Sequence, residues 1–366
     1  MRKNAGRLGA QCTGVNMPKR YKNLFEKIVA LDNMFLAAEN AMRGKRGKLP
    51  AAKCFSTLEK TVVNLRNELA NDEWRPGEYN YFMIDQPKER EIAAAPFRDR
   101  IVHHAMVHVL EPIFEPRFIA DTYACRNGKG THACLARAHQ FTKKYKYCLK
   151  CDIRQYFPSI DHELLVGQIE RAVADKRVMR LVDLILDSHT KSYKQEWPKD
   201  GGLFEVSERH CGLPIGNLTS QFFANIYLHP LDLFIKHDLR VKGYLRYVDD
   251  FLLFGDDKKL LKEQGNQVRE FVKTLRLTIH PNKFRMMATE NGVDMVGFVL
   301  YPDGRVRVRD SNVRRFVRRF RHQQWLVRNE FMNLEDFKIR TESWISHTKH
   351  AQARGLRKDI FASINI

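Results

Sequence analysis

The stretch LRYVDDFLLFG, Leu245–Gly255, decides the fold class because two adjacent carboxylates interrupt two short apolar runs. Apolar runs on both sides of Asp249 and Asp250 predict a strand, a tight turn and a second strand. Neighbouring carboxylates in apolar surroundings raise each other's pKa unless a cation neutralises them. The stretch therefore predicts a metal-binding hairpin in a sheet. A solvated turn without function is the plain alternative for these residues taken alone.

A third carboxylate, Asp152, ends the apolar run Lys146–Ile153, which is predicted to be a buried strand. Three carboxylates can hold two Mg²⁺ about 3.5–4 Å apart, the arrangement used for in-line phosphoryl transfer. Oxygen ligands favour Mg²⁺ over Zn²⁺. We therefore predict a site with two Mg²⁺ ions formed by Asp152, Asp249 and Asp250, with Ile153 beside them.

Composition points to a nucleic-acid partner. The 366 residues include 63 Lys and Arg against 43 Asp and Glu, a formal net charge of +20, which favours a polyanion. No apolar run is long enough for a transmembrane helix, so no membrane association is expected. The seven cysteines are an odd number in scattered apolar contexts, which fits reduced thiols in the cytoplasm. Cys148 and Cys151 lie in the predicted strand, so we interpret them as buried structural residues.

Hydrophobic periodicity predicts further elements around the two acidic segments. Strands are expected at 81–84, 146–153, on both sides of 249–250, and at 296–300. Helices are expected at 21–41, from 58, at 97–110, after Asp161 as an N-cap, after Gly216, and at 258–275. Ser56 and Glu59 form a possible capping box, and 188–210 is expected to be a loop or hairpin. The pattern predicts an α+β fold with an antiparallel sheet backed by helices.

Taken in order, the motifs resemble those of the reverse transcriptase family over residues 80 to 300. CDIRQYFPSID (151–161) resembles motif A, GLPIGNLTSQFFANIYL (212–228) motif B, YVDD (247–250) motif C, LTIHPNKF (277–284) motif D and MVGFVLY (295–301) motif E. PKEREIAAAPFRDRIVHHAM (87–106) and YACRNGKGTHACL (123–135) resemble the fingers motifs. The resemblance implies a right-hand polymerase with fingers, a palm and a short helical thumb.

The resemblance also implies roles for individual residues. Asp152, Asp249 and Asp250 are the metal ligands and Lys283 is the motif D lysine. Phe157 lies under the sugar of the incoming nucleotide, where a 2′-hydroxyl would clash. The remaining expected nucleotide contacts are Lys88, Arg90, Arg100, Ile215, Gly216 and Gln221. The expected template and primer contacts are Arg126, Lys129, Gly297, Arg314, Arg315, Arg318 and Arg319.

Motif B narrows the resemblance. Most reverse transcriptases have Gln-Gly and then Ser-Pro in this motif, whereas this chain has Ile215-Gly216 and Ser220-Gln221. That pattern is similar to the enzymes of diversity-generating retroelements. The similarity implies a template-repeat RNA, a DNA or cDNA primer strand, dNTPs, frequent errors at template adenines, and a small oligomeric accessory variability protein.

Residues 305–321 contain eight arginines, and Val313, Phe316, Val317 and Phe320 form an apolar stripe at helical spacing. We interpret this segment as a thumb helix that holds primer–template phosphates; a solvated basic face is the alternative. The predicted division is an N-terminal helical region and fingers at 1–145, a palm at 146–304 with fingers-type helices within 161–211, and a helical thumb at 305–366.

Several alternatives remain open on the sequence. A group II intron-like or retron-like reverse transcriptase of ordinary fidelity and an RNA-dependent RNA polymerase share most of these motifs. A basic RNA-binding scaffold without activity is the alternative outside the enzymes. The three intact carboxylates Asp152, Asp249 and Asp250 argue against a scaffold.

Overall fold

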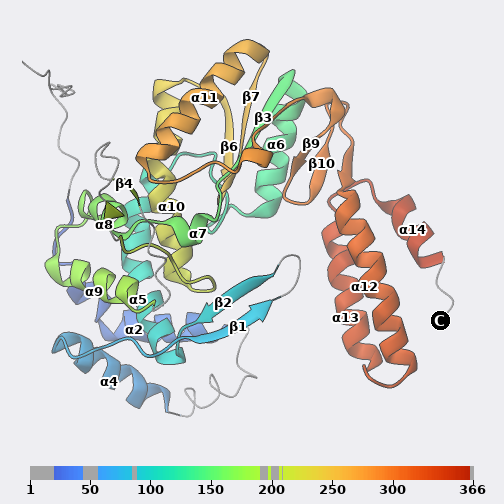
Figure 1. Ribbon diagram of the computed structural model, residues 1–366. Helices are drawn as coiled ribbons and strands as arrows, with labels where there is room; N and C mark the ends of the chain where they lie inside the picture. Colours follow the sequence, from blue (N-terminus) through green and yellow to red (C-terminus); the bar gives the residue numbers. More distant parts are fainter. Residues whose placement is uncertain are drawn as a thin grey trace, which may run out of the picture.

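A computed structural model describes residues 20–43, 57–84, 89–189, 197–198, 206–207, 209–362. Its centre is a four-stranded antiparallel sheet of order β6-β7-β3-β8 (Figure 1). The strands are β3 (Tyr147–Asp152), β6 (Gly243–Tyr247), β7 (Asp250–Gly255) and β8 (Arg285–Ala288). The predicted strand at 146–153 and the strand-turn-strand around Asp249 and Asp250 are confirmed.

The two faces of this sheet bury alternate side chains, as a pleated strand requires. Leu149, Cys151, Phe251 and Leu253 belong to the larger core, which α10 (Leu218–Leu233) and α11 (Lys258–Thr274) help to form. The opposite face packs on α6 (Thr131–Lys144). The predicted burial of Cys148 and Cys151 is confirmed, since both are free thiols without exposure.

A helical layer lies below the sheet in Figure 1 and carries a β-hairpin. It contains α1 (Phe25–Ile28), α2 (Leu31–Met42), α4 (Leu58–Ala70) and α5 (Phe97–Phe114), with α2 packed along α5. The hairpin pairs β1 (Asn80–Ile84) with β2 (Arg90–Ala94). The helical stretch predicted at 21–41 is confirmed as two helices, because the extended backbone of Ala30 separates α1 from α2. Ser56 lies outside the described residues.

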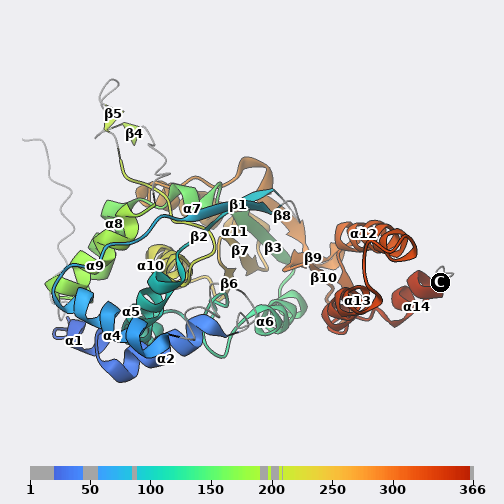
Figure 2. The same cartoon turned by 90° about the horizontal axis from the view of Figure 1, so that it is seen from below.

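Residues after β3 form α7 (Tyr156–Ser159), α8 (His162–Glu170) and α9 (Lys176–Asp187). Asp161 caps α8 as predicted, since its carboxylate accepts a hydrogen bond from the Leu164 amide at 3.1 Å. The paired residues of β4 (Trp197–Pro198) and β5 (Val206–Ser207) agree with the expected hairpin. Figure 2 shows them at the edge of the molecule, away from the central sheet.

A second, three-stranded sheet connects the centre to the C-terminal helices. It contains β9 (Val293–Met295), β10 (Phe298–Leu300) and β11 (Val306–Val308) in the order β11-β10-β9. The strand predicted at 296–300 is therefore wrong in its first part: Val296 and Gly297, both at positive φ, form a turn. Val306–Val308, which falls in the segment predicted to be the thumb helix, is a strand with its alternate residues buried. The helix therefore begins later than predicted.

The C-terminal helices are α12 (Asp310–Arg328), α13 (Leu334–Thr348) and α14 (Arg354–Ala362). Phe316 and Phe320 from the predicted apolar stripe face α13, where the Phe316 and Trp344 rings stack at 3.8 Å. In Figure 1 these helices stand apart from the central sheet. No described helix is long and apolar enough to cross a membrane. The domain boundaries at 145 and 304 stay predictions.

One buried ion pair braces the β6–β7 turn. Arg246 is 1% exposed, and its guanidinium donates to both carboxylate oxygens of Asp232 at 2.8 and 2.6 Å. Burial opposes the charge of Arg246, but Asp232 outweighs this effect and raises the pKa of the guanidinium. Arg246 also donates to the Val248 carbonyl at 2.9 Å, within the turn. The pair therefore joins helix α10 to the turn that carries Asp249.

We expect Arg246→Met to lower the free energy of unfolding by about 3–5 kcal/mol, because Asp232 would be left as an uncompensated buried charge. Urea unfolding measures the change. Lys273→Met is the matched control, since Lys273 and Glu270 form an ion pair whose side chains are 58% and 67% exposed, and such pairs contribute about 0–1 kcal/mol. Equal effects of the two substitutions would contradict a structural role for the buried pair.

Candidate active site

Strand pairing brings the three predicted carboxylates to one end of the sheet. Asp152, the last residue of β3, lies opposite Asp250, the first residue of β7. Asp249 lies in the turn before β7, and its carbonyl accepts a hydrogen bond from the Ile153 amide at 3.2 Å. Ile153, the fourth residue of the predicted metal site, therefore lies next to Asp249 through its backbone. The antiparallel register therefore gathers residues almost 100 positions apart in the chain.

A lysine contacts each of two carboxylates. Lys283 Nζ lies 2.7 Å from Asp152 Oδ1, which places the predicted motif D lysine at the site. Lys150 Nζ lies 3.2 Å from Asp250 Oδ2. Sequence reasoning missed Lys150, although its position two residues before Asp152 on the same strand face was a readable signal. Both ammonium groups compensate the negative charge in this structure.

Two of the three carboxyl groups have raised pKa values, as their apolar surroundings in the sequence predicted. Burial, followed by repulsion from Asp152, raises the pKa of Asp249. Burial raises the pKa of Asp250 to about 6, although Lys150 opposes the shift. Such a site favours the binding of a further cation when both groups are ionised.

The donor set fits divalent metal ions. Asp250 Oδ1 is buried and has no hydrogen-bond partner among the described residues. Three carboxylates supply the oxygen ligands that Mg²⁺ prefers. The side-chain positions do not themselves form a closed cage, since no three His, Cys, Asp or Glu within the described ranges converge on one point. Asp152 and Asp250 are turned toward Lys283 and Lys150 in this structure, which accounts for the open geometry.

The predicted nucleotide contacts in the fingers fall into three groups. Burial and Asp152 raise the pKa of Asp249, and the charge of Arg90, in β2, slightly opposes this rise. Arg100 donates to the Ala95 carbonyl at 2.8 Å, so its guanidinium is bonded to the backbone just after β2. Lys88 lies outside the described residues. The nucleotide contacts of Arg90, Arg100 and Lys88 therefore stay predictions.

Motif B contacts the same hairpin. The Ile215 carbonyl accepts a hydrogen bond from the Ala93 amide of β2 at 3.0 Å, and the Ile215 side chain is half-buried. Gly216 has φ +119°, and a Cβ there would lie 2.9 Å from Ile92, so this backbone strongly favours glycine. Gln221 is exposed on α10. Motif B thus joins the fingers hairpin to helix α10.

Phe157 is half-buried in α7, just after the left-handed residue Gln155 that turns the chain away from β3. Its ring lies 5.6 Å from that of Tyr156, and its carbonyl accepts a hydrogen bond from the Leu213 amide at 2.9 Å. Phe157, in motif A, therefore contacts motif B through its backbone, and part of its surface is accessible.

The residues predicted to contact the template differ in how deeply they are buried. Arg126 is only 5% exposed and donates to Glu115 and to the carbonyls of Ile119 and Thr122. This inward placement argues against our prediction of a template contact, because a buried guanidinium with these partners is structural. Lys129 is half-buried and donates to the Ala120 carbonyl at 2.9 Å.

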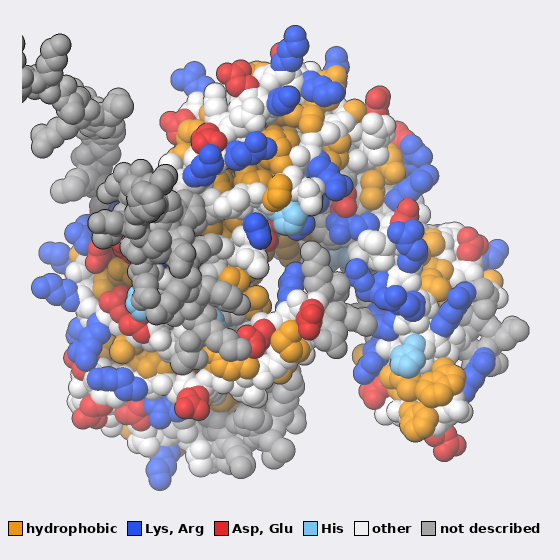
Figure 3. All heavy atoms as spheres, viewed as in Figure 1, with side chains coloured by type: hydrophobic (Ala, Val, Ile, Leu, Met, Phe, Trp, Pro, Cys, Tyr) orange, Lys and Arg blue, Asp and Glu red, His pale blue; other side chains and the backbone are white. Residues whose placement is uncertain are grey.

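Gly297 lies in a turn at the base of the thumb. The arginines of α12 lie on the thumb itself. Gly297 accepts a hydrogen bond from the Arg309 amide at 3.0 Å. Arg314, Arg318 and Arg319 are exposed on α12, and Arg315 is half-buried. Figure 3 shows Lys and Arg side chains gathered on the C-terminal helical region. The surface is hollowed between this region and the part of the molecule that contains the central sheet.

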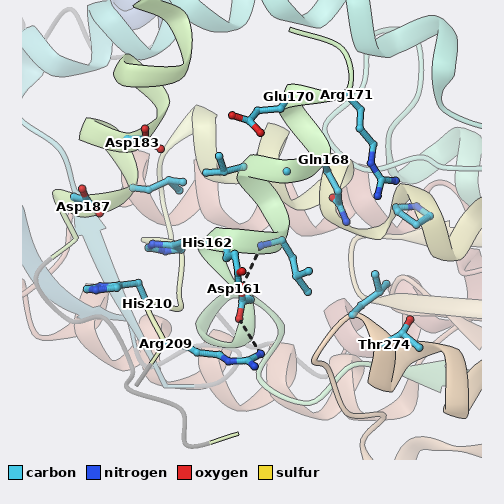
Figure 4. A pocket seen from close by; sticks show the side chains of 17 residues that line it. Asp161, His162, Gln168, Glu170, Arg171, Asp183, Asp187, Arg209, His210 and Thr274 are labelled. Atoms are coloured by element: carbon cyan, nitrogen blue, oxygen red, sulfur yellow. Dashed lines mark hydrogen bonds and ion pairs between the residues drawn. The ribbon is translucent and has the colours of Figure 1, made fainter. Parts of the chain in front are cut away.

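A cavity of about 880 Å³ lies elsewhere, beside α8 and α9. Figure 4 shows Asp161, His162, Asp183 and Asp187 among the residues that line it. None of the three predicted metal ligands lines this cavity. The three predicted metal ligands therefore lie at the end of the central sheet and not in this cavity.

An antiparallel sheet that ends in three carboxylates, flanked by a fingers hairpin and a basic helical thumb, defines a nucleotidyl-transferring polymerase. The family model "Reverse transcriptase (RNA-dependent DNA polymerase)" matches residues 85–300. The chain belongs to this family.

Curated relatives agree with the family. The group II intron-encoded protein LtrA of Lactococcus lactis subsp. cremoris is 25% identical over 60% of this chain and 36% of its own length. The uncharacterized 91 kDa protein in cob intron of Schizosaccharomyces pombe is 26% identical over 59% of this chain and 26% of its own length. Protein YkfC of Escherichia coli is 25% identical over 64% of this chain and 69% of its own length. The match thus spans about a third or less of the first two relatives.

We expect Asp250→Asn to stabilise the metal-free protein at pH 7.5 by about 1–3 kcal/mol and to have little effect at pH 4. The folded pKa of Asp250, about 6, exceeds the ordinary value of 3.8. The cost of ionising the buried group is therefore absent below pH 4, grows as the pH rises to 6, and is complete above it. Urea unfolding in EDTA measures both values.

The control is Asp238→Asn, which removes a charge at an exposed position. A gain in stability for Asp250→Asn that is the same at both pH values would contradict the raised pKa.

Proposed function

We propose that this reverse transcriptase extends a primer with dNTPs by means of two Mg²⁺ ions held by Asp152, Asp249, Asp250 and the backbone at Ile153. The observation that carries the proposal is the pairing of Asp152 with Asp250 at the end of β3 and β7. The bound ions would supply electrostatic stabilisation of the charge that develops during nucleotidyl transfer. Lys283, already at Asp152, would add a cationic partner for the triphosphate.

The remaining predicted residues are proposed to position the substrates. Arg90, Gly216 and Gln221, with Lys88 and Arg100, surround the incoming nucleotide in this proposal. Phe157 selects deoxyribose in this proposal: its backbone carbonyl is bonded to motif B, and its half-buried ring would meet a 2′-hydroxyl. Lys129, Gly297 and the arginines of α12 hold the template RNA and the primer strand by their phosphates, which fits the basic surface of the thumb.

We expect Asp249→Asn to reduce primer extension by about a thousandfold, because one oxygen ligand and one negative charge are lost from the ion site. Extension of a labelled DNA primer on an RNA template in Mg²⁺ measures the loss, and filter binding measures RNA affinity. Asp238→Asn is the matched control, since it is the same substitution at an exposed carboxylate that is not among the predicted ion ligands. Extension by Asp249→Asn at the rate of the control would overturn the proposed site.

For the biological role, we propose synthesis of cDNA with frequent adenine errors from a template-repeat RNA, with an oligomeric accessory variability protein as partner. The supporting observation is Ile215, whose carbonyl is held by β2 and whose half-buried side chain has no hydrogen-bonding group. A glutamine at this position could brace the nascent base pair, whereas isoleucine leaves selection to shape and pairing. Selection by fit alone provides about 1–3 kcal/mol.

A group II intron-like reverse transcriptase of ordinary fidelity is the second candidate. The names of the curated relatives favour it, since the LtrA protein and the cob intron protein are described by their introns. Identities of 25% and 26% support the family and its shared chemistry. We retain the mutagenic role as the first proposal because it depends on a motif B residue at which this chain differs from the usual glutamine.

We expect Ile215→Gln to lower the error rate opposite template adenines by about 10-fold, the effect of about 1.4 kcal/mol of added discrimination. Sequencing of cDNA made on a defined RNA measures errors at all four bases. Leu260→Gln, a similar substitution at an exposed position of α11, is the control. Equal adenine error rates in Ile215→Gln and the control, with activity retained, would favour the intron-type role.

A further inference from the structure

Lys150 is a cation that lies between the carboxylate site and the sheet at the base of the thumb. Its side chain is 16% exposed, and its Nζ lies 3.2 Å from Asp250 Oδ2. The same Nζ donates to the Asp294 carbonyl oxygen at 2.8 Å and lies 4.0 Å from Asp294 Oδ1. Asp294 is in β9, so one ammonium group joins the central sheet to the second sheet.

Asp294 in turn contacts the start of the thumb. Its Oδ1 accepts a hydrogen bond from the guanidinium of Arg309, the residue that directly precedes α12. The Arg309 amide donates to the Gly297 carbonyl at 3.0 Å, and Asn312 Nδ2 approaches the same oxygen at 3.4 Å. A continuous series of polar contacts therefore leads from Asp250 through Lys150, Asp294 and Arg309 to the first turn of α12.

A divalent ion at Asp250 would act directly on Lys150. The ammonium and the ion are both cations that seek the same carboxylate, so binding of one weakens binding of the other. Asp294 Oδ1 offers the displaced ammonium a second acidic partner, since it lies 4.0 Å away in the ion-free arrangement. Movement toward Asp294 would strengthen the contact between the two sheets without breaking the backbone hydrogen bond.

We propose that Lys150 is a positioning residue that couples ion binding at the carboxylates to the attachment of the thumb. Without ions it compensates Asp250; with ions bound it shifts its charge to Asp294 and stabilises the start of α12. Coupling between two sites is reciprocal. A thumb held against primer–template therefore raises the affinity of the carboxylates for ions, and ions are retained best when the duplex is in place. This inference rests on the proposed ion site.

The first measurement is Mn²⁺ binding to the full chain, followed by the loss of the free-ion signal in electron paramagnetic resonance. We expect Lys150→Met to bind Mn²⁺ about fivefold more tightly than wild type, because the competing charge is removed. Lys150→Arg retains the charge and should restore wild-type affinity. Lys262→Met, an exposed lysine on α11, is the control for net charge. Loss of folding or of packing alone would weaken Mn²⁺ binding, so the direction of the change identifies the competition.

The second measurement is hydrogen exchange in residues 305–316, with and without Mn²⁺. In wild type and Lys262→Met, Mn²⁺ should slow exchange there by about fivefold, and in Lys150→Met the ion should have no effect on this segment. Wild-type protein that binds no Mn²⁺ would overturn the proposed function and this inference together. Wild type and Lys150→Met with equal Mn²⁺ affinity, or with equal protection of 305–316, would overturn the role of Lys150 alone.

Discussion

The buried pair of Arg246 and Asp232 is the interaction on which the catalytic end of this molecule depends. The turn between β6 and β7 contains Val248 at φ +57°, a left-handed conformation that costs a β-branched residue about 1–3 kcal/mol. The Arg246 hydrogen bond to the Val248 carbonyl holds this turn closed. Because Asp232 fixes Arg246 to α10, the strain at Val248 is offset by the packing of a helix against the sheet. The position of Asp249 follows from this arrangement.

Once the turn is fixed, strand register brings the remaining charges together. β3 pairs with β7 through six residues, and the last pair places Asp152 opposite Asp250. A shift of one residue would turn the side chains of one strand to the other face of the sheet. The same register puts Lys150 on the face of Asp152 and Asp250, so the compensating cation is built into the strand that supplies the carboxylate. The structure thus combines a carboxylate cluster that needs cations with lysines that stabilise the ion-free form.

The sequence was informative where local patterns and chemistry agree. The apolar strands β3 and β7, the Asp161 cap of α8 and the pairing of the carboxylate segments were all predictable, because each depends on one short run or motif. Prediction failed where one residue breaks a longer pattern. The apolar segment from Val296 reads as a strand, yet Val296 and Gly297, both at positive φ, form the turn that pairs β10 with β9.

Partners distant in the chain account for what the sequence could not supply. Arg126 and Arg90 look equally suited to bind phosphate in the sequence, but Glu115 and the carbonyls around it bury Arg126, whereas Arg90 is exposed on β2 near Asp249. Lys150 likewise reads as an ordinary strand lysine until Asp250 and Asp294 are placed around it. The function of a cation in this molecule is therefore determined by which acidic groups the tertiary structure brings to it. In a chain with 63 Lys and Arg, the partners and not the number of charges distinguish structural, catalytic and nucleic-acid-binding residues.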